Sequence, residues 1–183
     1  GIRRKQGRVM RRFPVTVQML KWAEKHYGEA GVEAFIIFAT AVIAWFFLLR
    51  MGEYTTQDQQ GWRWDRVLTG ADLIPRQCGK EIQSFGGADE IVIYIKGSKT
   101  DQYNAGCIRN HYASGDSLCP VMVMAKMQRL FPERWGKEAH MPMFRTSKGQ
   151  MLKRADLAAL VKNAATAIGA DPEDFDIHSL KIG

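Results

Sequence analysis

The chain has 183 residues, of which 46% are hydrophobic and 25% charged, as expected for one globular domain of ordinary size. This composition excludes a collagen-like, a mucin-like or a wholly disordered protein. The formal net charge is +7, from 26 Lys and Arg against 19 Asp and Glu, and this charge is distributed unevenly along the chain.

The first 12 residues contain six basic residues and no acidic one; taking these six from the 26 Lys and Arg leaves 20 against 19 acidic residues. Guanidinium groups bind phosphate oxygens through paired N–H donors. We therefore expect residues 1–13 to form a basic arm or interdomain connector that contacts duplex DNA, ahead of a domain over residues 14–183. A solvated tail, a targeting signal and a contact with an anionic membrane stay open as alternatives. The six basic residues are Arg3, Arg4, Lys5, Arg8, Arg11 and Arg12.

Two helices are predicted in the first third of the domain. Thr16 is a suitable N-cap for an amphipathic helix that Gly28 stops. The apolar run over residues 34–49 would be about 24 Å long as a helix, shorter than the roughly 30 Å hydrocarbon core of a bilayer. It therefore predicts a buried core helix in place of a membrane span, and we expect this domain to have no membrane partner. We expect this helix to carry Arg50 and Glu53 at its C-terminal end.

The middle of the chain has the composition of β-structure. Residues 63–67 and 71–75 are β-like, and residues 90–96 (EIVIYIK) are rich in β-branched side chains. A turn at Gly97 would allow residues 105–112 to return as the paired strand. The tryptophans of the WRW motif at 62–64 are expected to pack on the sheet rather than to stack on bases.

Two further helices complete the expected fold. Pro120 in a first turn predicts a helix to residue 131, and apolar residues at helical spacing over 157–168, followed by Gly169, predict another. Residues 178–183 look like the start of one more helix, so the domain is expected to be incomplete at its C-terminus. The fold class predicted is α+β, mainly helical, with one small antiparallel sheet.

Cysteine and histidine usage predicts neither a disulfide framework nor a metal site. Three cysteines without a CxxC pair and four scattered histidines lack the spacing of zinc ligands, so we expect no metal and no cofactor. No signal peptide is recognisable, which predicts an intracellular protein. The residues are Cys78, Cys107 and Cys119, and His26, His111, His140 and His178.

Three separated fragments carry the functional hypothesis: LLRMGEY at 48–54, IYIKGSKT at 93–100 and IHSLKIG at 177–183. Each fragment alone is common in structural ion pairs, hairpin turns and helix starts. In this order and context they resemble the catalytic domain of the tyrosine recombinases, the phage-integrase family of DNA breaking and rejoining enzymes. The resemblance covers most of the chain. It implies that family's mainly helical fold and a location with DNA in a nucleus or nucleoid.

The resemblance assigns a role to each matched residue. Arg50 would bind the scissile phosphate and Glu53 would orient it. Lys99, in the hairpin turn, would protonate the leaving oxygen, and His178 would hydrogen-bond the phosphate or assist proton transfer. Such chemistry needs fixed cations and a proton donor but no metal. Lys181 stands where the family has a second arginine, and an ammonium cannot reproduce a bidentate guanidinium.

The nucleophilic tyrosine of the family would follow the third fragment, and every tyrosine in this sequence precedes His178. The sequence as it stands is thus expected to bind duplex DNA, and to act as a homo-oligomer on DNA when complete. A non-catalytic DNA-binding remnant, a type IB topoisomerase-like enzyme and a helical domain without a nucleic-acid role are the alternatives. The five tyrosines are interpreted as core, strand or loop residues: Tyr27, Tyr54, Tyr94, Tyr103 and Tyr112.

Overall fold

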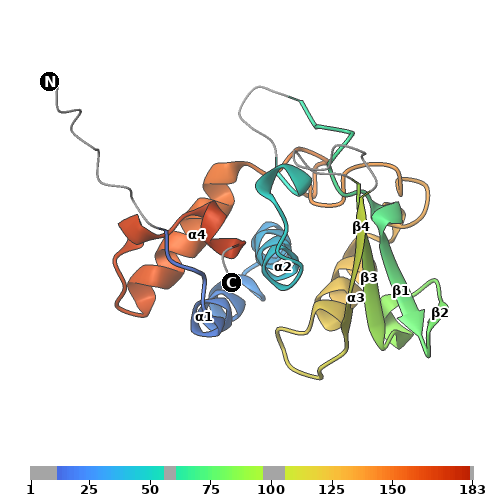
Figure 1. The fold of residues 1–183 in the computed structure, drawn as a ribbon, viewed down its shortest axis with the longest axis horizontal. Helices are drawn as coiled ribbons and strands as arrows, with labels where there is room; N and C mark the ends of the chain where they lie inside the picture. The colour runs from blue at the N-terminus through green and yellow to red at the C-terminus, as the bar shows by residue number, and fades with distance from the viewer. Residues whose placement is uncertain (1–11, 56–60, 97–105, 182–183) are drawn as a thin grey trace, which may run out of the picture.

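In the computed structural model, which describes residues 12–55, 61–96 and 106–181, helix α2 (Val32–Phe46) runs through the middle of the molecule (Figure 1). Most of its side chains are buried, because it is apolar on all sides and neighbours cover it. Helices α1 (Val17–Tyr27), α3 (Pro120–Leu130) and α4 (Arg154–Ala167) all pack against it. The predicted core helix is confirmed.

The ends of the other helices follow the predicted signals. The Thr16 hydroxyl accepts a hydrogen bond from the Met19 N–H at 3.3 Å, and Gly28 follows the last residue of α1. Pro120 is the first residue of α3. Gly169 follows α4 with a φ of 79°, a left-handed conformation that favours glycine.

The sheet has four antiparallel strands in the order β2-β1-β3-β4, and it stands beside the helices with α3 against one face (Figure 1). Leu73 pairs with Ile93, which pairs in turn with Arg109. Among the described residues the fold is therefore α+β, with four α-helices and one small antiparallel sheet, as predicted. The strands are β1 (Leu73–Gln77), β2 (Lys80–Glu81), β3 (Glu90–Ile95) and β4 (Cys107–Tyr112).

The strand predicted over residues 63–67 is wrong. Asp65 forms ion pairs with Arg63 at 2.9 Å and Arg66 at 3.3 Å, and the Arg63 carbonyl accepts hydrogen bonds from the N–H groups of Arg66 and Val67. These contacts close a turn in place of a strand. Trp62 and Trp64 contact each other, with ring centroids 5.6 Å apart, and do not lie in the sheet. Residues 70–72 form a 3-10 turn, so β1 begins at Leu73, and the short β2 was not predicted.

Helix α2 ends earlier than predicted, and this changes how Arg50 is presented. The helix stops at Phe46, and Leu48 has a φ of 50°. His111 Nε2 donates to the Phe46 carbonyl at 2.7 Å, and Arg109 Nη1 donates to the Phe47 carbonyl. These two donors from β4 satisfy carbonyls at the helix end, so the chain turns out of the helix before Arg50.

The segment before α1 is hydrogen-bonded to the last described residues. The Phe13 N–H donates to the Asp174 carbonyl and the Val15 N–H to the Ser179 carbonyl, each at 3.0 Å. Trp45 Nε1 donates to the Val15 carbonyl at 2.8 Å. The C-terminal 3-10 turn (Ile177–Leu180) consequently lies between α4 and α2 (Figure 1).

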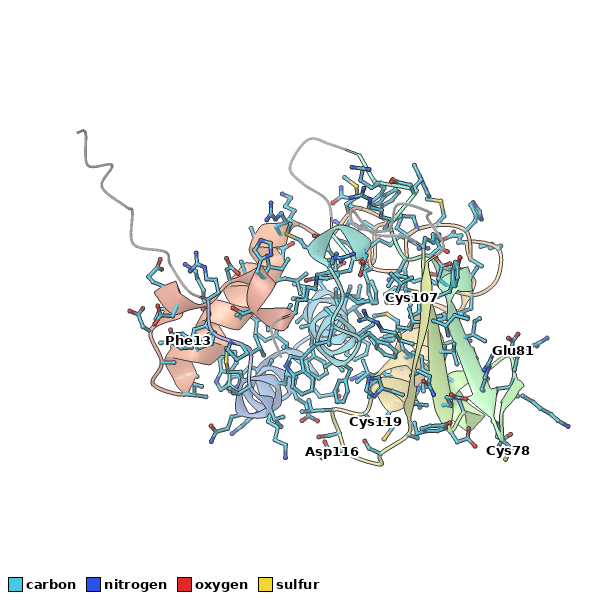
Figure 2. All side chains as sticks on the ribbon, in the orientation of Figure 1. Phe13, Cys78, Glu81, Cys107, Asp116 and Cys119 are labelled. Atoms are coloured by element: carbon cyan, nitrogen blue, oxygen red, sulfur yellow. The ribbon has the colours of Figure 1, made fainter. Side chains whose placement is uncertain are left out.

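The three cysteines are free and lie at separate places on the ribbon (Figure 2). Cys119 is buried at the N-terminus of α3, while Cys78 and Cys107 are exposed.

Within the described ranges, no helix has the length and hydrophobicity to cross a membrane.

Candidate functional site

The Glu53 carboxylate is the centre of the candidate site. Arg50 is extended and precedes a 3-10 turn over Met51–Glu53. The Arg50 N–H donates to Glu53 Oε2 at 2.8 Å, and the Glu53 N–H donates back to the Arg50 carbonyl at 2.8 Å. The Leu68 N–H bonds the Glu53 carbonyl at 2.9 Å. Glu53 is 4% exposed, so its carboxylate is fixed in place. The expectation that Arg50 and Glu53 share a helix with the core run is wrong, because both lie beyond the end of α2.

Three positive charges from separate segments act on this carboxylate. Burial raises the pKa of Glu53 above its ordinary value, while the hydrogen bond from the Arg50 N–H and then the charges of Arg50, Arg109 and Lys181 oppose that rise. Arg50 lies directly before the 3-10 turn, Arg109 on β4 and Lys181 in the C-terminal segment. The charges of two of the predicted site residues, Arg50 and Lys181, therefore act on the same carboxylate.

The C-terminal turn orients His178 and Lys181 toward solvent. The Asp176 carboxylate accepts from the His178 N–H at 2.7 Å, and the Ser179 hydroxyl accepts from the Asp176 N–H at 3.1 Å. Ser179 and Leu180 are buried, whereas His178 and Lys181 are exposed. The buried pair holds the turn on the core, so both polar side chains are accessible to a ligand.

Tyr54 lies beside the site but is a core residue. It is 2% exposed. Burial raises the pKa of the Tyr54 phenol, and the negative charges of Glu53 and Asp176 raise it further. The phenol therefore stays protonated at neutral pH and is enclosed, which is unsuited to a nucleophile.

Lys99 falls outside the described residues, in the connection between β3 and β4. The ends of these strands pair through Ile95 and Cys107, so a β-hairpin is present where the fragment match expects one. The neighbouring Lys96 forms an ion pair with the buried Asp72 at 2.8 Å. That pair anchors the last residue described before the hairpin turn.

Of the six basic residues of the arm, only Arg12 is described. Its Nε pairs with Asp176 at 3.1 Å, and its Nη1 donates to the Glu173 carbonyl. Arg12 is thus bound to the C-terminal segment of the domain. Outside the described residues lie Arg3, Arg4, Lys5, Arg8 and Arg11.

Sequence reasoning missed Arg109. Its alternation with His111 on β4 was a signal, because the two residues lie on the same side of the strand and pair with the buried Ile93 and Ile91. The sequence did not reveal that their partners are the carbonyl groups at the end of α2.

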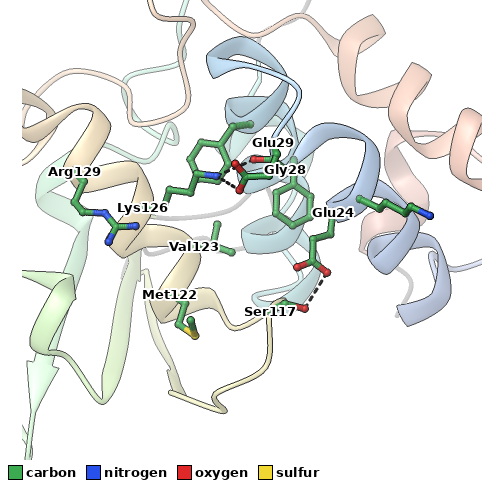
Figure 3. A pocket seen from close by; sticks show the side chains of 11 residues that line it. Glu24, Gly28, Glu29, Ser117, Met122, Val123, Lys126 and Arg129 are labelled. Carbon is green, nitrogen blue, oxygen red and sulfur yellow. Dashed lines mark hydrogen bonds and ion pairs between the residues drawn. The ribbon is translucent and has the colours of Figure 1, made fainter.

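A separate cavity of about 420 Å³ lies between α1, α2 and α3 (Figure 3). Lys126 bridges it, donating to the Gly28 carbonyl at 2.9 Å and pairing with Glu29 at 2.5 Å. Its lining includes none of Arg50, Glu53, His178 or Lys181.

In the part of the chain that the structure describes, no three His, Cys, Asp or Glu residues are grouped as metal ligands.

The sequence matches no protein-family model. A search of curated proteins also finds no match.

Proposed function

We propose that this chain is the catalytic part of a DNA strand-cleaving and rejoining enzyme of the tyrosine-recombinase type, which recombines or integrates duplex DNA. The observation that supports this most directly is that the buried Glu53 carboxylate accepts the Arg50 N–H at 2.8 Å and has its pKa lowered by the charges of both Arg50 and Lys181, against the effect of burial. Two cations held by a folded scaffold suit a phosphodiester whose non-bridging oxygens gain charge in the transition state.

In the proposed reaction a tyrosine hydroxyl attacks the scissile phosphorus, the bond to the 5′ oxygen breaks, and a 3′-phosphotyrosyl link forms. Arg50 binds a non-bridging oxygen, and Glu53 fixes the backbone on which Arg50 is carried. Lys181 supplies the second positive charge. His178, exposed in the same turn, donates a hydrogen bond to the phosphate or assists proton removal from the tyrosine.

Lys99 donates the proton that the departing 5′ oxygen takes up, and an ammonium of adjustable pKa suits that role. The β3–β4 hairpin is consistent with this assignment. We assign the nucleophile to none of the described tyrosines, since Tyr54, the one beside Glu53, is buried.

The joining half of this reaction can be tested without the protein's own tyrosine. The substrate is a pool of nicked duplexes, randomised around the nick, that carry a 3′-p-nitrophenyl phosphodiester next to a 5′-hydroxyl. Attack by the 5′ oxygen forms the new P–O bond and releases p-nitrophenolate, which absorbs visible light. We expect the chain to accelerate this release in EDTA, because the proposal includes no metal.

Arg50→Ala is expected to slow the release about 100-fold or more, the cost of removing one donor to a charged transition state. The matched control is Arg129→Ala, which removes an exposed arginine from α3, outside the candidate site. Equal rates for Arg50→Ala and the parent would contradict the proposal.

Lys181 in place of an arginine favours a second candidate function, DNA binding without strand cleavage. Binding of the duplex with no acceleration of p-nitrophenolate release would overturn the enzyme proposal in favour of this one. Absence of both binding and acceleration would overturn both.

A further inference from the structure

Arg109 lies beside the Arg50 segment of the candidate site. It is on β4 and pairs across the sheet with Ile93. Its Nη1 donates to the Phe47 carbonyl and lies 3.5 Å from the Leu48 carbonyl. The guanidinium is therefore fixed two or three residues before Arg50.

Much of the hydrogen-bonding capacity of Arg109 is left for a ligand. A guanidinium has five N–H donors in a planar fork, and both contacts above use Nη1. Among the described residues, Nη2 and Nε donate to no acceptor. The residue is also exposed, so a ligand can reach these donors.

The charge around Glu53 is unbalanced in favour of an anion. The cations of Arg50, Arg109 and Lys181 all act on this one carboxylate. The Arg50 N–H is bonded to Glu53 Oε2, and the Arg109 guanidinium is bonded two or three residues before Arg50, so hydrogen bonds place Arg109 and the Arg50 backbone close to this carboxylate. Duplex DNA presents phosphates at short, regular intervals and is attracted to such a position.

We propose that Arg109 is a third phosphate-binding residue of this site, its free N–H donors supplying the planar guanidinium that Lys181 does not. This inference rests on the proposed function, and it adds a residue that the three sequence fragments do not contain. Arg109 is held by the end of α2 and by β4 together, so its position relative to Arg50 is set before DNA binds.

The test measures how the affinity for a 30-base-pair duplex depends on salt, by fluorescence anisotropy. Each phosphate contact contributes about 0.9 to the slope of log K against log salt. We expect Arg109→Gln, which keeps an amide donor for the helix carbonyls but removes the charge, to lower the slope by about 0.9. Arg109→Lys, which keeps the charge, should retain the parent slope.

His111→Ala is the matched control for a purely structural role. It removes the other β4 donor at the end of α2, the bond to the Phe46 carbonyl, without removing a permanent charge. An equal loss of slope in Arg109→Gln and His111→Ala would overturn the proposal. Arg50→Ala in the same assay separates the two claims. A lowered slope for Arg50→Ala with an unchanged slope for Arg109→Gln refutes the Arg109 proposal alone, and unchanged slopes for both refute the proposed phosphate site.

A second measurement needs no variant and applies if Arg109→Gln does not fold. Phenylglyoxal modifies accessible guanidinium groups, and mass spectrometry locates the modified residue. We expect duplex DNA to protect Arg109 from modification. Equal modification of Arg109 with and without DNA would overturn the proposal.

Discussion

Replacing Asp176 by alanine removes two contacts at once. Its Oδ1 accepts from the His178 N–H at 2.7 Å, and its Oδ2 pairs with Arg12 Nε at 3.1 Å, with both side chains less than one third exposed. A lost cap costs about 1 kcal/mol and a partly exposed ion pair about 0.2–1 kcal/mol. We therefore expect Asp176→Ala to lower the free energy of unfolding by about 1–2 kcal/mol and the Tm by roughly 2–8 °C.

Urea unfolding followed by tryptophan fluorescence measures this loss. In an Arg12→Ala background the ion pair is already absent, so Asp176→Ala should cost only the cap, about 1 kcal/mol. Asp174→Ala is the control, because the Asp174 side chain has no hydrogen bond or ion pair with a described residue. A loss below about 0.3 kcal/mol for Asp176→Ala, or an equal loss for Asp174→Ala, would refute the reasoning.

Three other predictions concern Glu53, Lys181 and the basic arm. Because burial raises the pKa of Glu53 above 4.5, the parent should lose stability as the pH rises from about 4.5 through the folded-state pKa, and Glu53→Gln should lack this loss. In urea titrations, the free energy of unfolding of the parent minus that of Glu53→Gln should then be smaller at pH 7 than at pH 4. A larger difference at pH 7 would contradict this prediction. Lys181→Arg should raise the affinity for duplex DNA by up to about tenfold, the net value of one more hydrogen bond, and a weaker complex in anisotropy would indicate a site adapted to lysine. Deleting residues 1–11, which hold five of the six basic residues of the arm, should lower the salt slope of DNA binding by up to about 4.5, and an unchanged slope would exclude phosphate contacts by the arm.

Much of the fold could be predicted because its signals are local. The N-cap at Thr16, Pro120 in a first turn and Gly169 after α4 each act within a few residues of their own position. The β-branched run that forms β3 has a similarly local preference for extended backbone. The antiparallel pairing of β3 with β4 then required only a short connection.

The end of α2 could not be predicted because its cause is distant in sequence. The helix stops where Arg109 and His111 satisfy its last carbonyls, and these residues lie more than 60 positions away. The turn at residues 63–67 was misread for a different reason. Trp64 and Val67 favour a strand, but Asp65 pairs with arginines on both sides and closes the turn.

The candidate site was predicted in part. The fragments containing Arg50 and Lys181 were identified from the sequence, and the charges of both residues act on the Glu53 carboxylate in the structure. Arg109 was missed because its role depends on where β4 meets the end of α2. Arg12 was assigned to DNA on charge alone, and its contact with Asp176 is a tertiary interaction that composition does not reveal.

The most direct test of the phosphate site is a structure of this chain bound to a nicked duplex. We predict that Arg50 and Lys181 donate to the same phosphate, at roughly 2.7–3.2 Å, with Arg109 on that phosphate or on its neighbour. A complex in which DNA contacts only the basic arm, and the surroundings of Glu53 remain open to solvent, would contradict the account.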